Sequence, residues 1–362
     1  MGKIRVLHFE LDKNIGGIET FLLNLYTQID RNEVQFEFVT AVENPALGDR
    51  LEKLGGIIHR VSPHSNPFAY KKDISKLLEN NYDVIHVHKN SAANIIPLEL
   101  AEKSGAKKII VHSHNTAPSM GKASVLLHKM NRKKLCKIAD YKFACSTEAG
   151  KWLFGGDEFT LIKNGIITSR FLYDEKIAAE KRKELGVPEN AVLFGHVGRF
   201  TDQKNHTFLL DIFSEILKKK PESTLLLVGD GEHKSDCENK ARALKISDKV
   251  IFAGVREDIP DLMKAMDAFI MPSLYEGLPI VGIEAQAAGL PLFLSDTVSP
   301  ETELCGSVKW FSINDSADEI ADIILSETLS DTDTRIKRNS EIAKKGYDIK
   351  TTADYILNCY KE

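Results

Sequence analysis

The sequence contains little cysteine, and its few cysteines form no pattern. Five occur in 362 residues, at Cys136, Cys145, Cys237, Cys305 and Cys359. Their number is odd, their spacing is wide and no pair fits Cys-x-x-Cys, so neither a disulfide framework nor a cysteine zinc site is indicated. We therefore expect a protein of a reducing compartment, the cytoplasm.

Long hydrophobic runs are missing as well. A segment rich in apolar side chains, residues 278–295, is interrupted by Pro279, Gly282, Glu284, Gln286 and Pro291. A bilayer-spanning helix needs about 20 predominantly apolar residues, so this segment does not qualify. The amino terminus carries Lys3 and Arg5 before a short apolar run, which does not fit a secretion signal.

No charge of one sign dominates the chain, whose formal net charge is −4. Residues 1–168 carry a small surplus of Lys and Arg, and the remainder carries a larger surplus of Asp and Glu. No long basic stripe interleaved with aromatic residues occurs. A nucleic-acid-binding function is therefore not expected.

The hydrophobic pattern alternates between strands and helices. In the first half, strands are expected at 4–9, 36–41, 84–87, 109–112 and 141–145. Helical patterns lie between them, for example at 18–29 and 74–78. This alternation predicts right-handed crossovers and a doubly wound parallel sheet.

The pattern repeats in the second half. Strands are expected at 192–197, 224–228, 250–252 and 268–271. The polar stretch 164–190 and the chain length favour two domains, 1–168 and 169–346. A terminal helix, 347–362, is expected to cross back to the first domain. The predicted fold class is α/β, with two Rossmann-like domains facing a cleft.

The stretch 272–289 organises the second domain. It follows a buried strand, and Glu276-Gly277-Leu278-Pro279 predicts a turn in which Gly277 can adopt positive φ and Pro279 is the first helical residue. The helix would end at Gly289. Free amides at a helix start favour a phosphate. Glu276 and Glu284 would flank that site and accept hydrogen bonds from sugar hydroxyls. The alternative is that Glu276 is a solvated loop residue and Glu284 a surface residue of an ordinary helix.

Other turns at predicted strand ends carry glycines or cations. Gly16-Gly17 precedes the first helix, Arg199 and Lys204 follow the strand at 192–197, and Gly229-Asp230-Gly231 follows the next strand. The segment Gly254-Val255-Arg256 follows a third. Arg199 and Lys204 are spaced to reach a diphosphate. Each turn alone is weak evidence for a ligand site, but all of them lie at the predicted strand ends where open α/β sheets bind ligands.

Histidines recur in pairs along the first domain. His112 and His114 end the strand at 109–112 and would share one face of the sheet. One of them could place a hydrogen-bond donor against a sugar or phosphate, or could cap the backbone. His86 and His88 repeat the spacing one strand earlier. Nothing in the sequence completes a metal site, so we interpret this pair as structural.

Residues 121–137 form a basic helical stretch. Val125, Leu126, Leu127, Met130 and Leu135 are its apolar members. Such a helix can lie on an anionic bilayer surface, or it can pack on the sheet with its lysines in water.

Taken together, these motifs resemble those of the retaining glycosyltransferases of family four, which have the two-lobed GT-B fold. The resemblance covers the whole chain and depends on Gly-Gly-x-Glu at 16–19, Gly-Arg with Gln-Lys-Asn at 198–205 and Val-Gly-Asp-Gly-Glu at 228–232. Its most specific sign is the pair of glutamates at 276 and 284. Within the family, the chain is most similar to bacterial capsular and exopolysaccharide glycosyltransferases.

The resemblance implies roles for individual residues. Arg199 and Lys204 would hold the diphosphate of the donor, Glu276 its hexose and Glu284 its ribose, and His114 would assist departure of the diphosphate. The remaining donor-binding residues would be Gly17, Gly229, Val255, Arg256, Gly277 and Leu278.

The implied reaction moves a hexose or N-acetylhexosamine from a nucleoside-diphosphate sugar, expected to be a UDP-sugar, to a glycan or polyprenyl-linked acceptor. No metal or other cofactor is expected, because cationic side chains would neutralise the leaving diphosphate. The enzyme would lie in the cytoplasm, with peripheral membrane contact through 121–137 as an option. The alternatives are a non-hydrolysing UDP-sugar epimerase and a non-catalytic regulator that binds sugar nucleotides.

Overall fold

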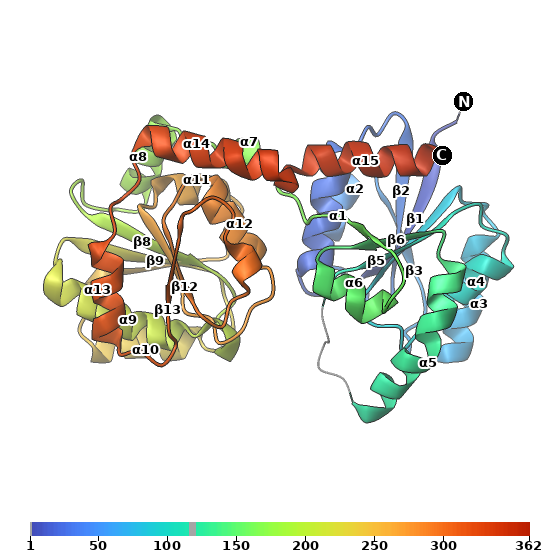
Figure 1. Cartoon of the computed structure of the whole chain (residues 1–362), viewed down its shortest axis with the longest axis horizontal. Helices are drawn as coiled ribbons and strands as arrows, with labels where there is room; N and C mark the ends of the chain where they lie inside the picture. The colour runs from blue at the N-terminus through green and yellow to red at the C-terminus, as the bar shows by residue number, and fades with distance from the viewer. Residues whose placement is uncertain (1, 116–120) are drawn as a thin grey trace. The chain divides into compact units, whose positions relative to one another are not determined.

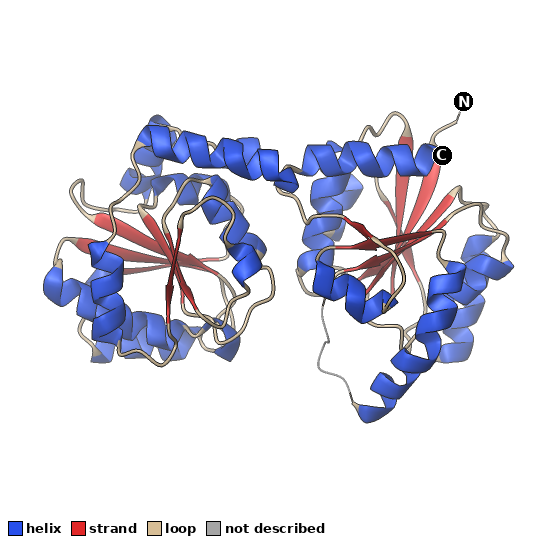
Figure 2. Ribbon diagram, in the orientation of Figure 1, coloured by secondary structure: helices blue, strands red, loops and turns tan. Residues whose placement is uncertain are grey.

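The computed structural model describes residues 2–115 and 121–362 and divides the chain into two compact units. The first unit comprises Met1–Ile166 together with Asp348–Glu362, and the second comprises Ile167–Tyr347. The sequence placed the boundary at residue 168 and the start of the returning segment at 347. Each unit is a parallel sheet with helices on both faces (Figure 2).

The sheet of the first unit has seven strands in the order β3-β2-β1-β4-β5-β6-β7. The strands are β1 (Ile4–Leu11), β2 (Val34–Thr40), β3 (Ile57–Arg60), β4 (Val84–Lys89), β5 (Ile109–Ser113), β6 (Tyr141–Ala144) and β7 (Thr160–Leu161). The helices are α1 (Gly17–Gln28), α2 (Gly48–Lys53), α3 (Pro67–Leu78), α4 (Ile96–Lys103), α5 (Lys122–Ile138), α6 (Thr147–Phe154) and α15 (Ile349–Lys361).

The sheet of the second unit has six strands in the order β10-β9-β8-β11-β12-β13. The strands are β8 (Val192–Val197), β9 (Ser223–Val228), β10 (Val250–Gly254), β11 (Ala268–Met271), β12 (Leu292–Ser295) and β13 (Val308–Phe311). The helices are α7 (Thr168–Phe171), α8 (Glu175–Glu184), α9 (His206–Lys219), α10 (Lys234–Ala243), α11 (Ile259–Ala265), α12 (Ile280–Ala287), α13 (Ala317–Ser326) and α14 (Thr332–Ile342). Shorter helical turns are η1 (Asp202–Lys204), η2 (Ser247–Lys249), η3 (Pro300–Thr302) and η4 (Ala343–Tyr347).

The two faces of the first sheet differ in chemistry. Leu7 and Phe9 of β1 face a hydrophobic core built with α3, α4, α5 and α6. The alternate residue, His8, lies on the opposite face beside Phe36 of β2. Helices α1 and α15 pack against each other in this unit (Figure 1), and Tyr360 of α15 bonds to His86 of β4. The histidines are therefore enclosed between the sheet and helices from both ends of the chain.

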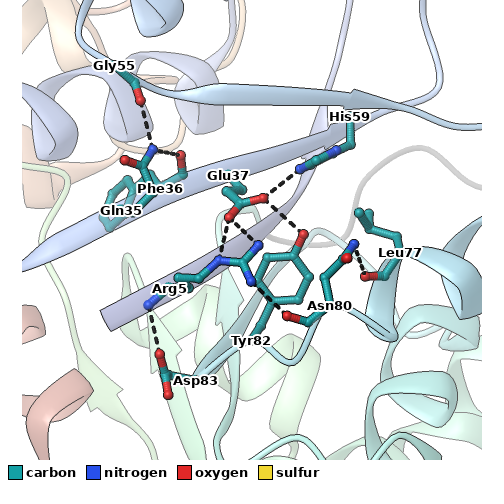
Figure 3. Close-up of polar contacts among 10 residues, drawn as sticks. All are labelled: Arg5, Gln35, Phe36, Glu37, Gly55, His59, Leu77, Asn80, Tyr82 and Asp83. Atoms are coloured by element: carbon teal, nitrogen blue, oxygen red, sulfur yellow. Dashed lines mark hydrogen bonds and ion pairs between the residues drawn. The ribbon is translucent and has the colours of Figure 1, made fainter. Parts of the chain in front are cut away.

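A buried carboxylate, that of Glu37, joins strands β1, β2 and β3 of this sheet (Figure 3). Glu37 of β2 accepts from Arg5 of β1 through Nε and Nη2, at 2.9 and 2.7 Å, and bonds to His59 of β3 at 2.7 Å. The hydroxyl of Tyr82, just before β4, donates to it at 3.0 Å. Burial opposes ionisation of Glu37, but these hydrogen bonds hold its pKa below the ordinary value. Because Arg5 and Tyr82 lie at strand starts, away from the ligand-binding edge, we interpret the network as structural.

Several elements differ from those expected. Strands β3, β7, β12 and β13 were not predicted, and α12 begins at Ile280, so Pro279 is its N-cap rather than its first residue. Gly277 does not have positive φ. Residues 175–184, expected to belong to a polar stretch between the domains, form helix α8. No helix in the described part of the chain has the length and apolarity needed to cross a membrane.

Candidate functional site

The predicted donor-binding residues of the second unit lie at the carboxyl edge of its sheet. Arg199 and Lys204 follow β8, Gly229 follows β9, Val255 follows β10 and Glu276 follows β11. These four strands are neighbours in the order β10-β9-β8-β11. The loops after them therefore meet at one edge, where parallel sheets bind ligands.

Backbone packing fixes two of these loops against each other. Gly198 N donates to Val228 O at 2.9 Å, and Gly229 N donates to Gly254 O at 2.8 Å. Gly229 has φ of +138°, and a Cβ at this position would lie 2.1 Å from Gly198 O. Only glycine fits there, because both the backbone conformation and the space exclude a side chain.

Lys204 connects the loop after β8 with the loop after β11. Its Nζ lies 2.6 Å from Glu276 Oε1, and the two side chains are 17% and 12% exposed. Gln203 reinforces the connection, since its carbonyl accepts from Leu274 N at 2.8 Å and its Nε2 donates to Tyr275 O at 3.0 Å. The pair holds an ammonium and a carboxylate side by side in a site that is only partly open to water.

Arg199 offers a second cation on the same edge. Its side chain is exposed, and it makes no hydrogen bond or ion pair with any other described residue. Lys204 is neutralised by Glu276, whereas the guanidinium of Arg199 is uncompensated. An anion that reaches this edge thus meets the unpaired guanidinium of Arg199 beside an ammonium that Glu276 holds in place.

Unpaired amides lie beside these cations. The amides of Gly277, Leu278, Ile280 and Val281 donate to no other described residue. Gly282 N, by contrast, bonds to Pro279 O at 3.0 Å. A run of free amides leading into a helix favours an anion.

Glu284 lies in α12, downstream of these amides. Burial raises its pKa to about 7, and Arg170 of α7 opposes that shift. Its carboxylate accepts no hydrogen bond from another described residue. A neighbouring hydroxyl donor would therefore stabilise its ionised form.

The side chain of Arg256 forms ion pairs within the second unit. The guanidinium lies 2.6 Å from Glu184 and 2.7 Å from Asp258. Its backbone amide and that of the exposed Val255 have no hydrogen-bond partner among the described residues. The side chain thus holds the loop, and the two amides are available to a ligand.

In the first unit, the Gly-Gly-Ile-Glu turn is organised by its glutamate. Glu19 is buried and accepts from Gly16 N at 3.0 Å and from Asp12 N at 3.1 Å. These bonds fix the loop that enters α1 and place Gly17 at the first helical position, with open space where a side chain would be. The glutamate has a structural role, and the amide of Gly17 donates to no other residue in the described part of the chain.

His114 follows β5 and contacts other histidines. Its Nε2 lies 2.8 Å from His88 Nδ1, and its ring centroid lies 4.1 Å from that of His112. Burial lowers the pKa of His114 to about 3, so its ring is neutral near pH 7. The sequence placed His112 and His114 on one face but gave no sign of contact with His88, because strand register is not visible in the sequence.

Two groups of histidines have the spacing of metal ligands. Ring nitrogens lie within 4.8 Å of one another in His8, His86 and His88, and again in His88, His112 and His114. No cysteine or acidic residue joins either group within the described residues. The sequence interpretation of His86 and His88 as structural did not include His8, which lies on a different strand.

Comparison with known proteins identifies the family. The model of Glycosyltransferase Family 4 matches residues 15–170, and that of Glycosyl transferases group 1 matches residues 178–347. EpsF of Bacillus subtilis (strain 168), whose name places it among the glycosyltransferases, is 32% identical over 98% of this chain and 96% of its own length. The chain belongs to glycosyltransferase family 4.

Two further proteins show lower sequence identity to this glycosyltransferase. An Escherichia coli enzyme named UDP-Gal:alpha-D-GlcNAc-diphosphoundecaprenol alpha-1,3-galactosyltransferase is 25% identical over 81% of this chain and 80% of its own length. The crystal structure of Anabaena Alr3699/HepE in complex with UDP has a TM-score of 0.79 at 20% identity and covers 99% of both chains. At that identity the likeness shows the fold, which is GT-B with two Rossmann-like units.

Proposed function

We propose that this glycosyltransferase moves a hexose or N-acetylhexosamine from a UDP-sugar to a glycan or polyprenyl-linked acceptor, with retention at the anomeric carbon. The product would be part of a cell-surface polysaccharide. The names of the E. coli relative and of the Anabaena complex, which include a UDP-sugar, a diphosphoundecaprenol acceptor and UDP, support this choice of substrates.

The Lys204–Glu276 pair is the observation that carries the proposal. Lys204 and Arg199 would neutralise the diphosphate, while the amides of Gly277 and Leu278 bind its oxygens. Glu276 would accept from hexose hydroxyls and Glu284 from the ribose. The amides of Val255 and Arg256 would contact the base, and Gly229 would let the backbone approach.

The reaction would be a front-face displacement. The bond from the anomeric carbon to the phosphate oxygen breaks as the acceptor oxygen bonds to the same face of that carbon. The proton of the acceptor hydroxyl passes to the departing phosphate oxygen. We assign to His114 the role of assisting departure of the diphosphate, and to the amide of Gly17 the role of binding it. The side chains of Arg199 and Lys204 supply the positive charge, so we propose that no metal is required.

Helix α5 supports a lipid-linked acceptor. Leu126 and Met130 are 60% and 66% exposed, and Lys122, Lys129 and Lys133 are exposed on the same helix. A cavity of about 470 Å³ adjoins α5 and is lined in part by Leu127 and Asn131. Apolar side chains among lysines suit the surface of an anionic membrane. We therefore place the enzyme at the cytoplasmic face of a membrane, held peripherally by α5.

Two variants test the proposal. Lys204→Ala and Glu276→Ala should each reduce sugar transfer at least 100-fold with unchanged circular dichroism. Transfer is measured as nucleoside-diphosphate release across a panel of donors, with membrane lipid extract as acceptor. Lys218→Ala and Glu215→Ala remove an ion pair of 2.7 Å on the surface of α9 and should leave transfer unchanged.

The same assay separates the alternatives. An epimerase would convert the donor sugar without needing an acceptor, and a regulator would bind UDP without turnover. Near-normal transfer by Lys204→Ala and Glu276→Ala would contradict the proposed site.

A further inference from the structure

Five histidines lie together on the sheet face of the first unit that α1 and α15 cover. His8 of β1 is opposite His86 of β4, and His88 is opposite His112 of β5. All four are fully buried. The fifth, His114, lies just beyond the end of β5, after His112 and Ser113. Burial lowers the pKa of every one of these rings, so near pH 7 each is neutral and carries one proton.

Three of the rings form a hydrogen-bonded chain. His8 Nδ1 lies 3.1 Å from His88 Nε2, and His88 Nδ1 lies 2.8 Å from His114 Nε2. The two ends of the chain, His8 Nε2 and His114 Nδ1, are buried and have no partner within the described residues. The chain thus starts beside Phe36, whose ring centroid is 4.2 Å from that of His8, and ends at the residue proposed to face the donor sugar.

The chain couples the tautomers of its three rings. A neutral imidazole has one N–H and one accepting nitrogen. If Nδ1 of His114 carries the proton, its Nε2 must accept from Nδ1–H of His88. Nε2 of His88 must then accept from Nδ1–H of His8. Moving the proton of His114 to Nε2 reverses both bonds. All three rings therefore carry their protons on Nδ1, or all three carry them on Nε2.

We propose that His88 and His8 are positioning residues that fix the orientation and tautomer of His114, and that a phosphate or sugar oxygen at His114 Nδ1 selects the all-Nδ1–H state. In that state His114 presents a neutral hydrogen-bond donor to the substrate, and the unprotonated Nε2 of His8 is buried without a partner among the described residues. The role of His114 as a donor to the substrate rests on the proposed function, whereas the coupling of the three tautomers does not.

The other two histidines lie outside the chain. His86 directs Nδ1 to the hydroxyl of Tyr360 at 2.8 Å, and neither nitrogen of His112 has a partner within the described residues. His112 is as deeply buried as His88, and both rings contact the rings of Phe21, His86 and His114. It therefore serves as a matched control.

The ring geometry favours hydrogen bonding over metal coordination. A metal lies in the plane of each histidine that binds it, yet the rings of His86 and His88 are stacked at 4.4 Å with an interplanar angle of 21°. In the second group, His88 Nδ1 and His114 Nε2 are 2.8 Å apart. Two nitrogens on a tetrahedral zinc, with bonds of about 2.0–2.1 Å, would be roughly 3.3 Å apart.

Histidine ¹⁵N NMR tests the coupling without any assay of activity. Full-length protein with ¹⁵N-labelled histidine is compared at pH 7.5 with and without UDP, and single His variants provide assignments. His8, His88 and His114 should share one tautomer, and UDP should leave all three as Nδ1–H. Different tautomers among the three, a doubly protonated ring, or stoichiometric zinc in the purified protein would overturn the proposal.

Two substitutions at His88 test the positioning role. The amide of His88→Asn overlies Nδ1 and keeps the bond to His114, whereas that of His88→Gln overlies Nε2 and keeps only the bond to His8. We expect kcat within about threefold of wild type for His88→Asn, a loss of tenfold or more for His88→Gln, and little change for His112→Leu. KM for the donor should change less than kcat.

The results separate the two proposals. Full activity of His114→Ala would remove the proposed role of His114 while leaving the NMR result valid. Loss of activity in His114→Ala with equal activity of His88→Asn and His88→Gln would instead contradict the positioning role.

Discussion

Glu284 shows how a residue that is proposed to bind a ligand can lower the stability of the fold. Its pKa is raised by burial from 4.5 to about 7 in the folded protein. Between these two values the native carboxyl holds a proton that the unfolded chain has lost. The folded state therefore loses stability as pH rises through this window, and the loss is complete above pH 7.

Replacing Glu284 with glutamine should reverse this cost. Glu284→Gln is expected to raise Tm by a few degrees at pH 8, since each unit of pKa shift corresponds to about 1.4 kcal/mol, and to weaken UDP binding at least tenfold. Differential scanning calorimetry and titration calorimetry measure the two effects. Glu222→Gln, at the opposite edge of the sheet, should change neither.

The pH dependence of UDP binding follows from the same carboxyl. Ribose hydroxyls would donate to the ionised form, so UDP affinity of the wild type should rise by up to tenfold per pH unit between pH 5.5 and 7, then level off. Glu284→Gln should bind with little dependence on pH. A wild-type affinity that is constant across this range would show that Glu284 does not contact the nucleotide.

The glycines of the site differ sharply in what they tolerate. Alanine at Gly229 would require φ of +138° and a Cβ 2.1 Å from a carbonyl oxygen, whereas a Cβ at Gly277 would meet nothing within 4 Å. Gly229→Ala should lower the free energy of unfolding by at least about 2 kcal/mol, and Gly277→Ala should change it by less than about 0.5 kcal/mol. Urea denaturation distinguishes the two, and equal effects would contradict the close approach at Gly229.

At the scale of elements, the sequence predicted what depends on local pattern. Strands β8 and β11 have the expected limits, because fully buried parallel strands are continuous apolar runs. Strand β3 was missed because its residues are exposed or half-buried, and β13 because Lys309 interrupts its short apolar run.

The candidate site was predictable only in part, because the sequence shows local patterns but not contacts between distant segments. Glycine turns and cations at strand ends are visible in the sequence, and the structure places Lys204 against Glu276. The chain through His8 and His88 depends on the register of β1 against β4, a non-local property. In the turn after β11, Glu276 pairs with Val298, and such a contact between segments that are distant in the sequence is not encoded locally.

Helix α5 provides an element-scale prediction. Replacing Leu126 and Met130 with glutamine removes exposed apolar area but leaves the lysines. The double variant should bind vesicles containing phosphatidylglycerol at least fivefold more weakly than wild type in a sedimentation assay. Phe68→Gln, which changes an 88% exposed side chain on α3, is the control. Equal binding by wild type and the double variant would contradict membrane contact through this helix.

At the scale of the whole molecule, buried neutral histidines make folding sensitive to acid. Burial lowers the pKa of eight histidines in the folded state: His8, His86, His88, His112, His114, His128, His196 and His206. Below the ordinary histidine pKa of about 6.5, the unfolded chain binds protons that the native protein excludes. Stability contributed by these rings is present above that pH and is lost as pH falls.

The first unit holds six of these rings and the second holds two, so the first should open at higher pH. Hydrogen exchange detected by mass spectrometry, from pH 7 to pH 5, should show protection lost first in β1, β4 and β5 and later in β8. Each ring contributes a slope of up to about 1.4 kcal/mol per pH unit, so His112→Leu should flatten the acid dependence of the first unit. The exposed His64→Leu should not, and simultaneous loss of protection in both units would show that the buried histidines do not control the acid transition.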